Sequence, residues 1–150
     1  DICEVIESSK DEANKELVRD NLLKSLSKDE AVTLIKLLPS LARLIGIQES
    51  VVGEIIGNTS LLQAFVKFKL LCRKFLSAVA TERQPIVLLL DDMQWADDGS
   101  TEVFKSLCSH MDSKHALLVA AYRDNDGFVP PTNMEMILPS TDVVIPRLGV

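Results

Sequence analysis

Long apolar runs, paired cysteines and an excess of basic residues are all missing from this 150-residue sequence. No apolar run approaches the roughly 20 residues that a membrane-spanning helix needs, and the beginning of the chain has no signal-peptide pattern. The formal net charge of -6 argues against nucleic-acid binding, because general affinity for phosphate backbones comes from clustered Lys and Arg. We therefore expect a soluble, cytoplasmic protein without a membrane or nucleic-acid partner.

The cysteines and histidines do not form a framework. Cys3, Cys72 and Cys108 are odd in number, far apart, and each lies in an apolar helical pattern. They fit small buried residues in a reducing compartment better than a disulfide or zinc framework. His110 and His115 have no acid or thiol in register, so we expect no metal site there. The chain also begins without Met, inside what reads as a helix over residues 1–8, so we expect a fragment.

The sequence is organised around an apolar run, Ile86–Leu90, that stops at two adjacent carboxylates, Asp91 and Asp92. The run is short enough for a strand. Because it has no polar alternation, we expect both of its faces to be covered, as in a parallel sheet between helices. The acids then lie at the carboxyl end of the strand, where open α/β sheets bind ligands. A bound cation would relieve their mutual repulsion, although a solvated acidic turn after a buried strand explains the same pattern.

Residues 86–121 spell strand, helix and strand, with a crossover long enough for parallel pairing. Turn residues 98–100 predict a helix start capped by Ser100. The second apolar run, 116–121, ends next to Arg123, which places a cation at the same sheet edge as the two acids. Farther on, we expect a helical turn at 134–138 and a third strand at 141–145. The inward face of the crossover helix should be Val103, Phe104, Leu107, Cys108 and Met111.

The first 80 residues have helical periodicity. Three capping boxes, Ser9–Glu12, Ser27–Glu30 and Ser60–Gln63, mark helix starts, while Pro39 and Gly46 mark helix ends. The apolar stripes that we expect to be buried are Leu17, Val18, Leu22, Leu23 and Leu26; Ala31, Leu34, Ile35 and Leu38; Leu41, Leu44 and Ile45; and Leu61, Phe65, Phe68, Cys72, Phe75, Leu76 and Val79. The cations of the longest helix avoid its stripe and should form a solvated face: Lys67, Lys69, Arg73 and Lys74.

The segment Leu88–Asp97, read LLLDDMQWAD, resembles the Walker B signature of the origin-recognition-like AAA ATPase domains, a branch of the STAND NTPases in large signalling proteins. Those domains typically read LDDLQWAD followed by a Ser that begins a helix, and Ser100 occupies that place. The resemblance extends upstream to Leu37–Gly46 and downstream to Leu117–Asn125.

The resemblance implies an α/β fold: a partial P-loop NTPase three-layer sandwich with a short parallel sheet and a helical N-terminal half. Residues 1–150 would be the C-terminal portion of one AAA/STAND-type NTPase domain. Within it, residues 1–80 would be a helical segment. Residues 81–150 would supply the Walker B strand, a crossover helix, a sensor strand and a last strand. The expected ligands are ATP and Mg²⁺, and the expected partners are other domains of a multidomain signalling protein.

The family's roles can be placed on individual residues. Asp91 would hold Mg²⁺, and Asp92 would orient or activate the hydrolytic water. Arg123 would be a sensor-type residue that contacts the γ-phosphate, although an arginine at a strand end is often only a salt-bridge partner. Trp95 would pack the acidic turn against the neighbouring helix.

The departure from the family is a missing phosphate-binding loop. The six glycines are scattered, and no GxxxxGK[ST] motif occurs among the 150 residues. In family members this loop lies upstream, on a strand between those that end at Ala121 and Ile145, so we expect a gap in the sheet. The complete protein would bind and slowly hydrolyse ATP as a conformational switch, while these 150 residues alone would not.

Two other functions fit parts of the pattern. A phospho-receiver domain also places paired acids after a strand, but it needs another Asp at a later strand end, and here residues 121–123 read Ala-Tyr-Arg. A nucleotide-free protein-interaction module with a degenerate NTPase fold is the main alternative.

Overall fold

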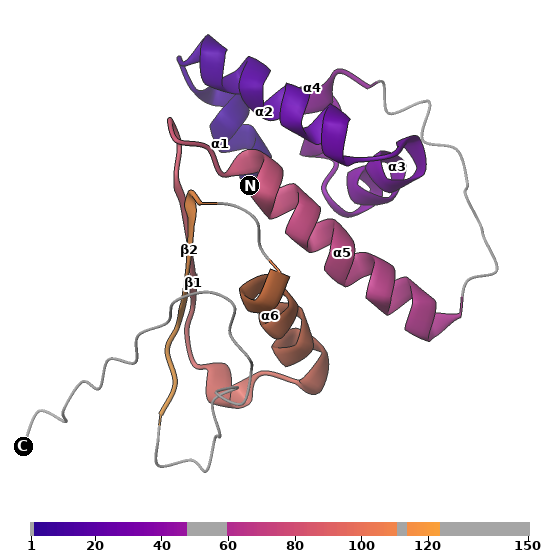
Figure 1. Cartoon of the computed structure of the whole chain (residues 1–150), viewed down its shortest axis with the longest axis vertical. Coiled ribbons are helices and arrows are strands. Elements are labelled where there is room, and N and C mark those ends of the chain that lie inside the picture. The colour runs from indigo at the N-terminus through magenta and orange to yellow at the C-terminus, as the bar shows by residue number, and fades with distance from the viewer. Residues whose placement is uncertain (1, 48–59, 111–113, 124–150) are drawn as a thin grey trace, which may run out of the picture.

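The computed structural model describes residues 2–47, 60–110 and 114–123. This part of the chain forms α-helices, one short 3₁₀ helix and two strands (Figure 1). The elements in chain order are α1 (Ile2–Ser8), α2 (Glu12–Ser25), α3 (Lys28–Leu37), α4 (Ser40–Ile45), α5 (Leu61–Val79), β1 (Ile86–Leu90), η2 (Met93–Trp95), α6 (Asp98–His110) and β2 (Ala116–Ala120).

Helix α5 lies between two groups of elements (Figure 1). The shorter helices α1–α4 pack together on one side of it, chiefly through α2, and α6 with the two strands lies on the other. The strands are parallel and in register from Ile86 opposite Ala116 to Leu90 opposite Ala120. The predicted α/β fold, a helical N-terminal half followed by a short parallel sheet, is therefore confirmed.

The helix boundaries follow from local chemistry. In two of the predicted capping boxes, Ser27 with Glu30 and Ser60 with Gln63, each side chain bonds the other residue's backbone N–H. The box expected at Ser9–Glu12 is wrong. Asp11 caps α2 by accepting a hydrogen bond from the Asn14 N–H at 3.0 Å, and its carboxylate suits the positive end of the helix dipole.

The helix ends predicted from Pro39 and Gly46 are confirmed. Helix α3 stops at Leu37, two residues before Pro39, and α4 ends where Gly46 takes a left-handed conformation at φ 72°. A side chain at Gly46 would be strained by that conformation and would also meet the guanidinium of Arg19.

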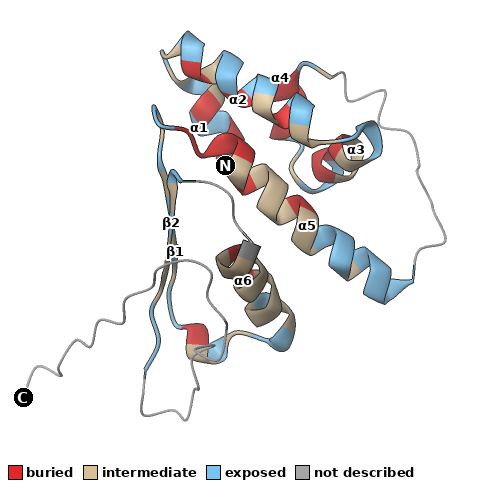
Figure 2. Ribbon diagram, in the orientation of Figure 1, coloured by how far each residue is buried: buried red, intermediate tan, exposed pale blue. Residues whose placement is uncertain are grey.

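The hydrophobic core is built mainly from α1–α4 and the second half of α5, and α6 adds Leu107 to it (Figure 2). Most predicted stripe residues are buried or half-buried, but four are exposed: Leu17 and Leu23 on α2, at 43% and 50%, and Leu61 and Phe68 on α5, at 90% and 37%. The first turn of α5 extends beyond the other described elements, which leaves Leu61 exposed (Figure 2). Leu71, outside the predicted stripe, is fully buried. The fully buried larger side chains are Ile6, Val18, Leu22, Leu41, Leu71 and Val79.

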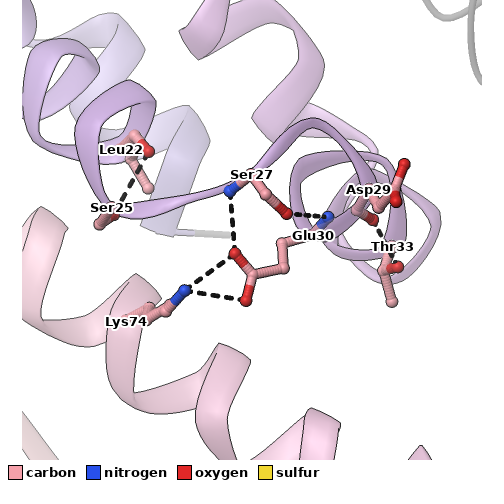
Figure 3. Close-up of polar contacts among 7 residues, drawn as sticks. All are labelled: Leu22, Ser25, Ser27, Asp29, Glu30, Thr33 and Lys74. Atoms are coloured by element: carbon pink, nitrogen blue, oxygen red, sulfur yellow. Dashed lines mark hydrogen bonds and ion pairs between the residues drawn. The ribbon is translucent and has the colours of Figure 1, made fainter.

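The cations of α5 do not all face solvent. Lys74 donates to both carboxylate oxygens of Glu30 at 2.8 Å, which ties α5 to the start of α3 (Figure 3). Lys69 lies 3.6 Å from Glu102 of α6 and over the ring of Phe65. The predicted solvated face is therefore wrong for these two lysines, because their long side chains reach acids on neighbouring helices. It is also wrong for Arg73, which is half-buried with a buried Nε.

A buried polar network joins α2 to the turn before β1. Thr81 donates its hydroxyl to the Asn14 Oδ1 at 2.6 Å, and Asn14 donates its Nδ2 to Gln84 Oε1 at 2.8 Å. The turn itself is closed by the Gln84 N–H, which donates to Thr81 Oγ1 at 3.1 Å. These contacts fix the beginning of β1 against the helical half.

Within the described residues, only one face of the sheet is covered. Ile86, Leu88 and their neighbours on β2 pack against the core, whereas Val87, Leu89 and Leu117 are 64%, 62% and 58% exposed. The expectation that both faces of β1 are buried is therefore wrong, because all the labelled helices lie on the same side of the sheet (Figure 1). An unbroken apolar sequence does not by itself say what covers each face.

Cys3 is buried and Cys72 and Cys108 are half-buried, and none of the three is in a disulfide. Burial raises the pKa of each thiol, as expected for cysteines that act as apolar side chains. None of the helices in the described ranges has the length and apolarity that a bilayer crossing needs. The expected helical turn at 134–138 and strand at 141–145, and the placement of Met111, lie outside the described residues.

Candidate functional site at the carboxyl ends of the strands

The parallel ladder continues for one step past the strands and then loses its regular spacing. The Ala121 N–H donates to the Leu90 carbonyl at 2.8 Å, so regular pairing would next bring in the N–H of Asp92. Instead the Met93 N–H donates to the Ala121 carbonyl at 2.9 Å. One extra residue therefore lies between Leu90 and Met93, which makes a bulge. Bulges redirect side chains and are frequent next to functional sites.

The bulge contains the two predicted acids. Asp92 adopts the left-handed conformation, at φ 54° and ψ 38°, and among the described residues it is the only non-glycine with positive φ. Its N–H, released from the ladder, donates to Asp91 Oδ1 at 2.8 Å. Asp is one of the residues that tolerates this conformation, which still costs an ordinary L-residue about 1–2 kcal/mol. Both acids are exposed at the sheet edge.

Arg123 lies at the same edge, as predicted from the end of the second strand. Its Nη2 is 3.8 Å from Asp92 Oδ1, and both side chains are more than half exposed. Exposed ion pairs of this kind contribute about 0.2–1 kcal/mol and weaken with salt. The structure thus brings Asp91, Asp92 and Arg123 together, but the arginine is held only loosely by its charge.

Gln94 also belongs to this site, although no role was predicted for it from the sequence. Its Nε2 donates to Asp92 Oδ1 at 2.9 Å, and its Oε1 accepts from the Arg123 N–H at 3.1 Å. Gln94 therefore links the two strand ends directly. It belongs to the same short segment as the acids, but only the backbone path of the bulge and η2 brings its amide to both partners.

The expected packing role of Trp95 is wrong. The indole is 76% exposed, whereas Met93, two residues earlier, is almost fully buried. The left-handed step at Asp92 and the 3₁₀ turn that follows direct Met93 inward and leave Trp95 on the outside.

Helix α6 begins immediately after this turn. Asp97 accepts a hydrogen bond from the Ser100 N–H at 2.6 Å and so caps the helix, in place of the expected Ser100. That hydrogen bond holds the pKa of Asp97 below its ordinary value. Gly99 faces the ring of Phe65 on α5, where an added Cβ would lie 3.9 Å from Phe65 Cε2. The start of α6 therefore lies next to α5.

The donor set suits a divalent cation that prefers oxygen. Asp91 and Asp92 each use one carboxylate oxygen in hydrogen bonds, and their Oδ2 atoms accept none from the described part of the chain. Within that part, no group of three or more acids, cysteines or histidines could hold a metal alone. Mg²⁺ commonly takes one or two protein carboxylates and completes its shell with phosphates and water.

Comparison with known proteins gives one result. The family model described as AAA ATPase domain matches residues 4–119, more than half of the chain, and includes both acids, while Arg123 lies just beyond the match. No curated protein and no solved structure matches. The chain therefore belongs to the AAA ATPase domain family of P-loop NTPases.

Proposed function

We propose that these residues form the Mg²⁺-facing and water-facing edge of an ATP-binding, ATP-hydrolysing switch domain of the origin-recognition-like, STAND branch. Strand β1 and its two acids would be the Walker B segment. The observation that carries the proposal is that the two acids, in a bulge at Asp92, lie next to Arg123 beyond adjacent parallel strand ends.

Each residue has a distinct part in this proposal. Asp91, whose Oδ1 is taken by the Asp92 N–H, presents its other oxygen to Mg²⁺ directly or through water. Asp92 positions the attacking water and accepts its proton. Arg123 contacts the γ-phosphate and leaves Asp92 when it does so, because their separation of 3.8 Å is a weak contact. When bound, Mg²⁺ neutralises negative charge on the phosphates.

The residues that would hold the phosphates come from elsewhere in this proposal. Without a GxxxxGK[ST] loop, the 150 residues lack the backbone amides and lysine that cradle β- and γ-phosphates. Isothermal titration of Mg-ATP into this chain should therefore show no binding. Micromolar affinity would contradict the need for a loop from outside these residues.

The catalytic roles are tested in a longer chain that carries the loop. Asp91→Ala should weaken Mg²⁺-dependent nucleotide binding, and Asp92→Asn should slow hydrolysis more than binding. Asp98→Ala and Asp98→Asn are matched controls, because Asp98 is an exposed acid on the first turn of α6 and does not lie at the sheet edge. Unchanged turnover in both the Asp91 and Asp92 variants would remove the acids from the mechanism.

A second function has one observation in its favour. The uncovered face of the sheet presents Val87, Leu89 and Leu117 to solvent, and exposed apolar side chains grouped on a sheet are typical of a contact surface. A nucleotide-free interaction module would use this face and would keep its partner when both acids are replaced. A longer chain that carries the loop and still binds no Mg-ATP would favour this alternative.

A further inference from the structure

We propose that Gln94 is the positioning residue of this site. Its side chain holds the Asp92 carboxylate in place relative to the end of the second strand, where Arg123 lies. This inference rests on the proposed function, because it assigns a means of orienting the acid that faces the attacking water. It concerns a side chain with no charge and no expected contact with the nucleotide.

The two hydrogen bonds of Gln94 fix the orientation of its amide. The Arg123 backbone N–H can only donate, so the Gln94 oxygen must face it, at 3.1 Å. The amide nitrogen then faces the Asp92 carboxylate, which can only accept, at 2.9 Å. Each end of the amide therefore meets the one partner that it can satisfy.

The side chain takes the place of a backbone contact. If the ladder continued regularly, the Arg123 N–H would next donate to the main-chain carbonyl of Asp92. That carbonyl instead accepts from the Trp95 N–H at 2.9 Å, inside η2. The oxygen of the Gln94 amide supplies the missing acceptor for the Arg123 N–H, and its nitrogen donates to the Asp92 carboxylate. The bulge that displaces Asp92 and the contact that restrains its side chain are thus parts of one arrangement.

The ion pair between Asp92 and Arg123 cannot hold the Asp92 carboxylate in one orientation. Asp92 and Arg123 are 3.8 Å apart and more than half exposed, so salt and water weaken their attraction. A hydrogen bond at 2.9 Å constrains direction as well as distance. The hydrogen bond between Gln94 and Asp92 also persists when the Arg123 side chain moves toward a phosphate, because Gln94 contacts the backbone N–H of Arg123 and not its guanidinium.

Substitutions at Gln94 separate the two contacts. Glu keeps an oxygen acceptor for the Arg123 N–H but replaces the donor with a second carboxylate oxygen beside Asp92. Met has a similar length and removes both contacts. Because Gln94 lies on a turn with its side chain outside the core, both variants should fold, which circular-dichroism melting of the 150-residue chain would check.

The first measurement needs no nucleotide. In the 150-residue chain, hydrogen exchange of the Arg123 amide should accelerate about tenfold in Gln94→Met and stay near the wild-type rate in Gln94→Glu. Wild-type exchange in Gln94→Met would show that the contact does not form, and the proposal would be overturned.

The second measurement uses the longer chain that carries the phosphate loop, with Mg-ATP. Both Gln94→Met and Gln94→Glu should lower kcat about ten- to a hundredfold and leave the KM for Mg-ATP near wild type. Neither should slow turnover further when Asp92 is already Asn, because Gln94 acts through Asp92. A purely structural role at Arg123 would leave Gln94→Glu active, and that result overturns the proposal.

The two proposals fail in different ways. If Asp92→Asn slows turnover and the Gln94 variants do not, only the positioning role is lost. If Asp92→Asn itself turns over normally, the proposed function fails and the positioning role fails with it.

Discussion

Lys74 of α5 holds both carboxylate oxygens of Glu30, each at 2.8 Å, across the junction between the longest helix and α3 (Figure 3). The same carboxylate accepts the Ser27 N–H at 2.8 Å, so one side chain serves as a helix cap and as an interhelical ion pair. Glu30 is only 14% exposed and Lys74 is 30% exposed, which limits screening by water. The pair is therefore more than a surface salt bridge.

The ion pair of Glu30 and Lys74 should make the stability of the chain depend on pH. Burial raises the pKa of Glu30, but the hydrogen bonds and charge of Lys74 and the Ser27 cap outweigh it, so the pKa lies below the ordinary 4.5. A depressed carboxyl pKa stabilises the fold above the unfolded value and loses that contribution as the pH falls through the folded value. Urea unfolding should therefore show stability falling below about pH 4.5, and Glu30→Gln should remove part of that slope. An unchanged slope would contradict the pairing.

The partner of Glu30 gives a second test at neutral pH. Lys74→Met should lower the free energy of unfolding by about 1–3 kcal/mol, because it leaves a half-buried carboxylate without its cation. Lys67→Met is the matched control on the same helix: Lys67 is exposed, so its loss should cost less than about 0.5 kcal/mol. Equal effects of the two variants would mean that the pair contributes nothing specific.

The network between α2 and the turn before β1 should be cooperative. Asn14 and Thr81 are 1% and 3% exposed, so removing either leaves a buried polar group without its partner. Asn14→Ala and Thr81→Val should each destabilise the chain by about 1–3 kcal/mol. In a double-mutant cycle measured by urea unfolding, the coupling should be about 0.5–3 kcal/mol. Strict additivity would show that the two residues act independently.

The sequence predicted most of the helices, because periodicity and capping boxes are local signals. It could not say how far each apolar stripe meets a partner. Leu61 repeats at the right spacing yet is exposed, since that depends on where α5 extends past its neighbours. The cap predicted at Ser9 is wrong for a similar reason: Ser9 and Asp11 can both cap a helix, and only the path of the chain shows that α2 starts after Asp11.

The site was predictable to the level of which residues meet. Two parallel strands share their carboxyl edge, so the acids after β1 and the arginine after β2 had to come close. The bulge was not predictable, because the sequence Asp-Asp-Met does not indicate whether a residue adopts the left-handed conformation, or which one does. The contacts of Gln94 and the exposure of Trp95 depend on that backbone path. For this reason no role was predicted for Gln94, and the packing role predicted for Trp95 was wrong.

The asymmetric burial of β1 leads to a paired prediction. Leu88 packs against the core, whereas Leu89, the next residue, is on the uncovered face. Leu88→Ala should cost about 1–3 kcal/mol in thermal or urea unfolding, while Leu89→Ala should stay within about 0.5 kcal/mol. Both variants remove the same atoms from neighbouring positions of one strand, so each is the control for the other. A large loss in Leu89→Ala would restore the two-sided burial that the sequence predicts.

Two residues at the start of α6, Asp97 and Ser100, could each cap the helix. Asp97 accepts the Ser100 N–H at 2.6 Å, and Ser100 lies inside the first turn of α6. Asp97→Ala should therefore lower Tm, whereas Ser100→Ala should leave it nearly unchanged. Asp97→Asn keeps the acceptor, so it should retain the cap and lose its dependence on pH. In the wild type, the hydrogen bond from the Ser100 N–H depresses the Asp97 pKa, so the cap weakens only as the pH falls below the ordinary value of 3.8. A drop in Tm for Ser100→Ala alone would mean that Ser100 caps α6 and that the acidic turn ends there instead of at Asp97.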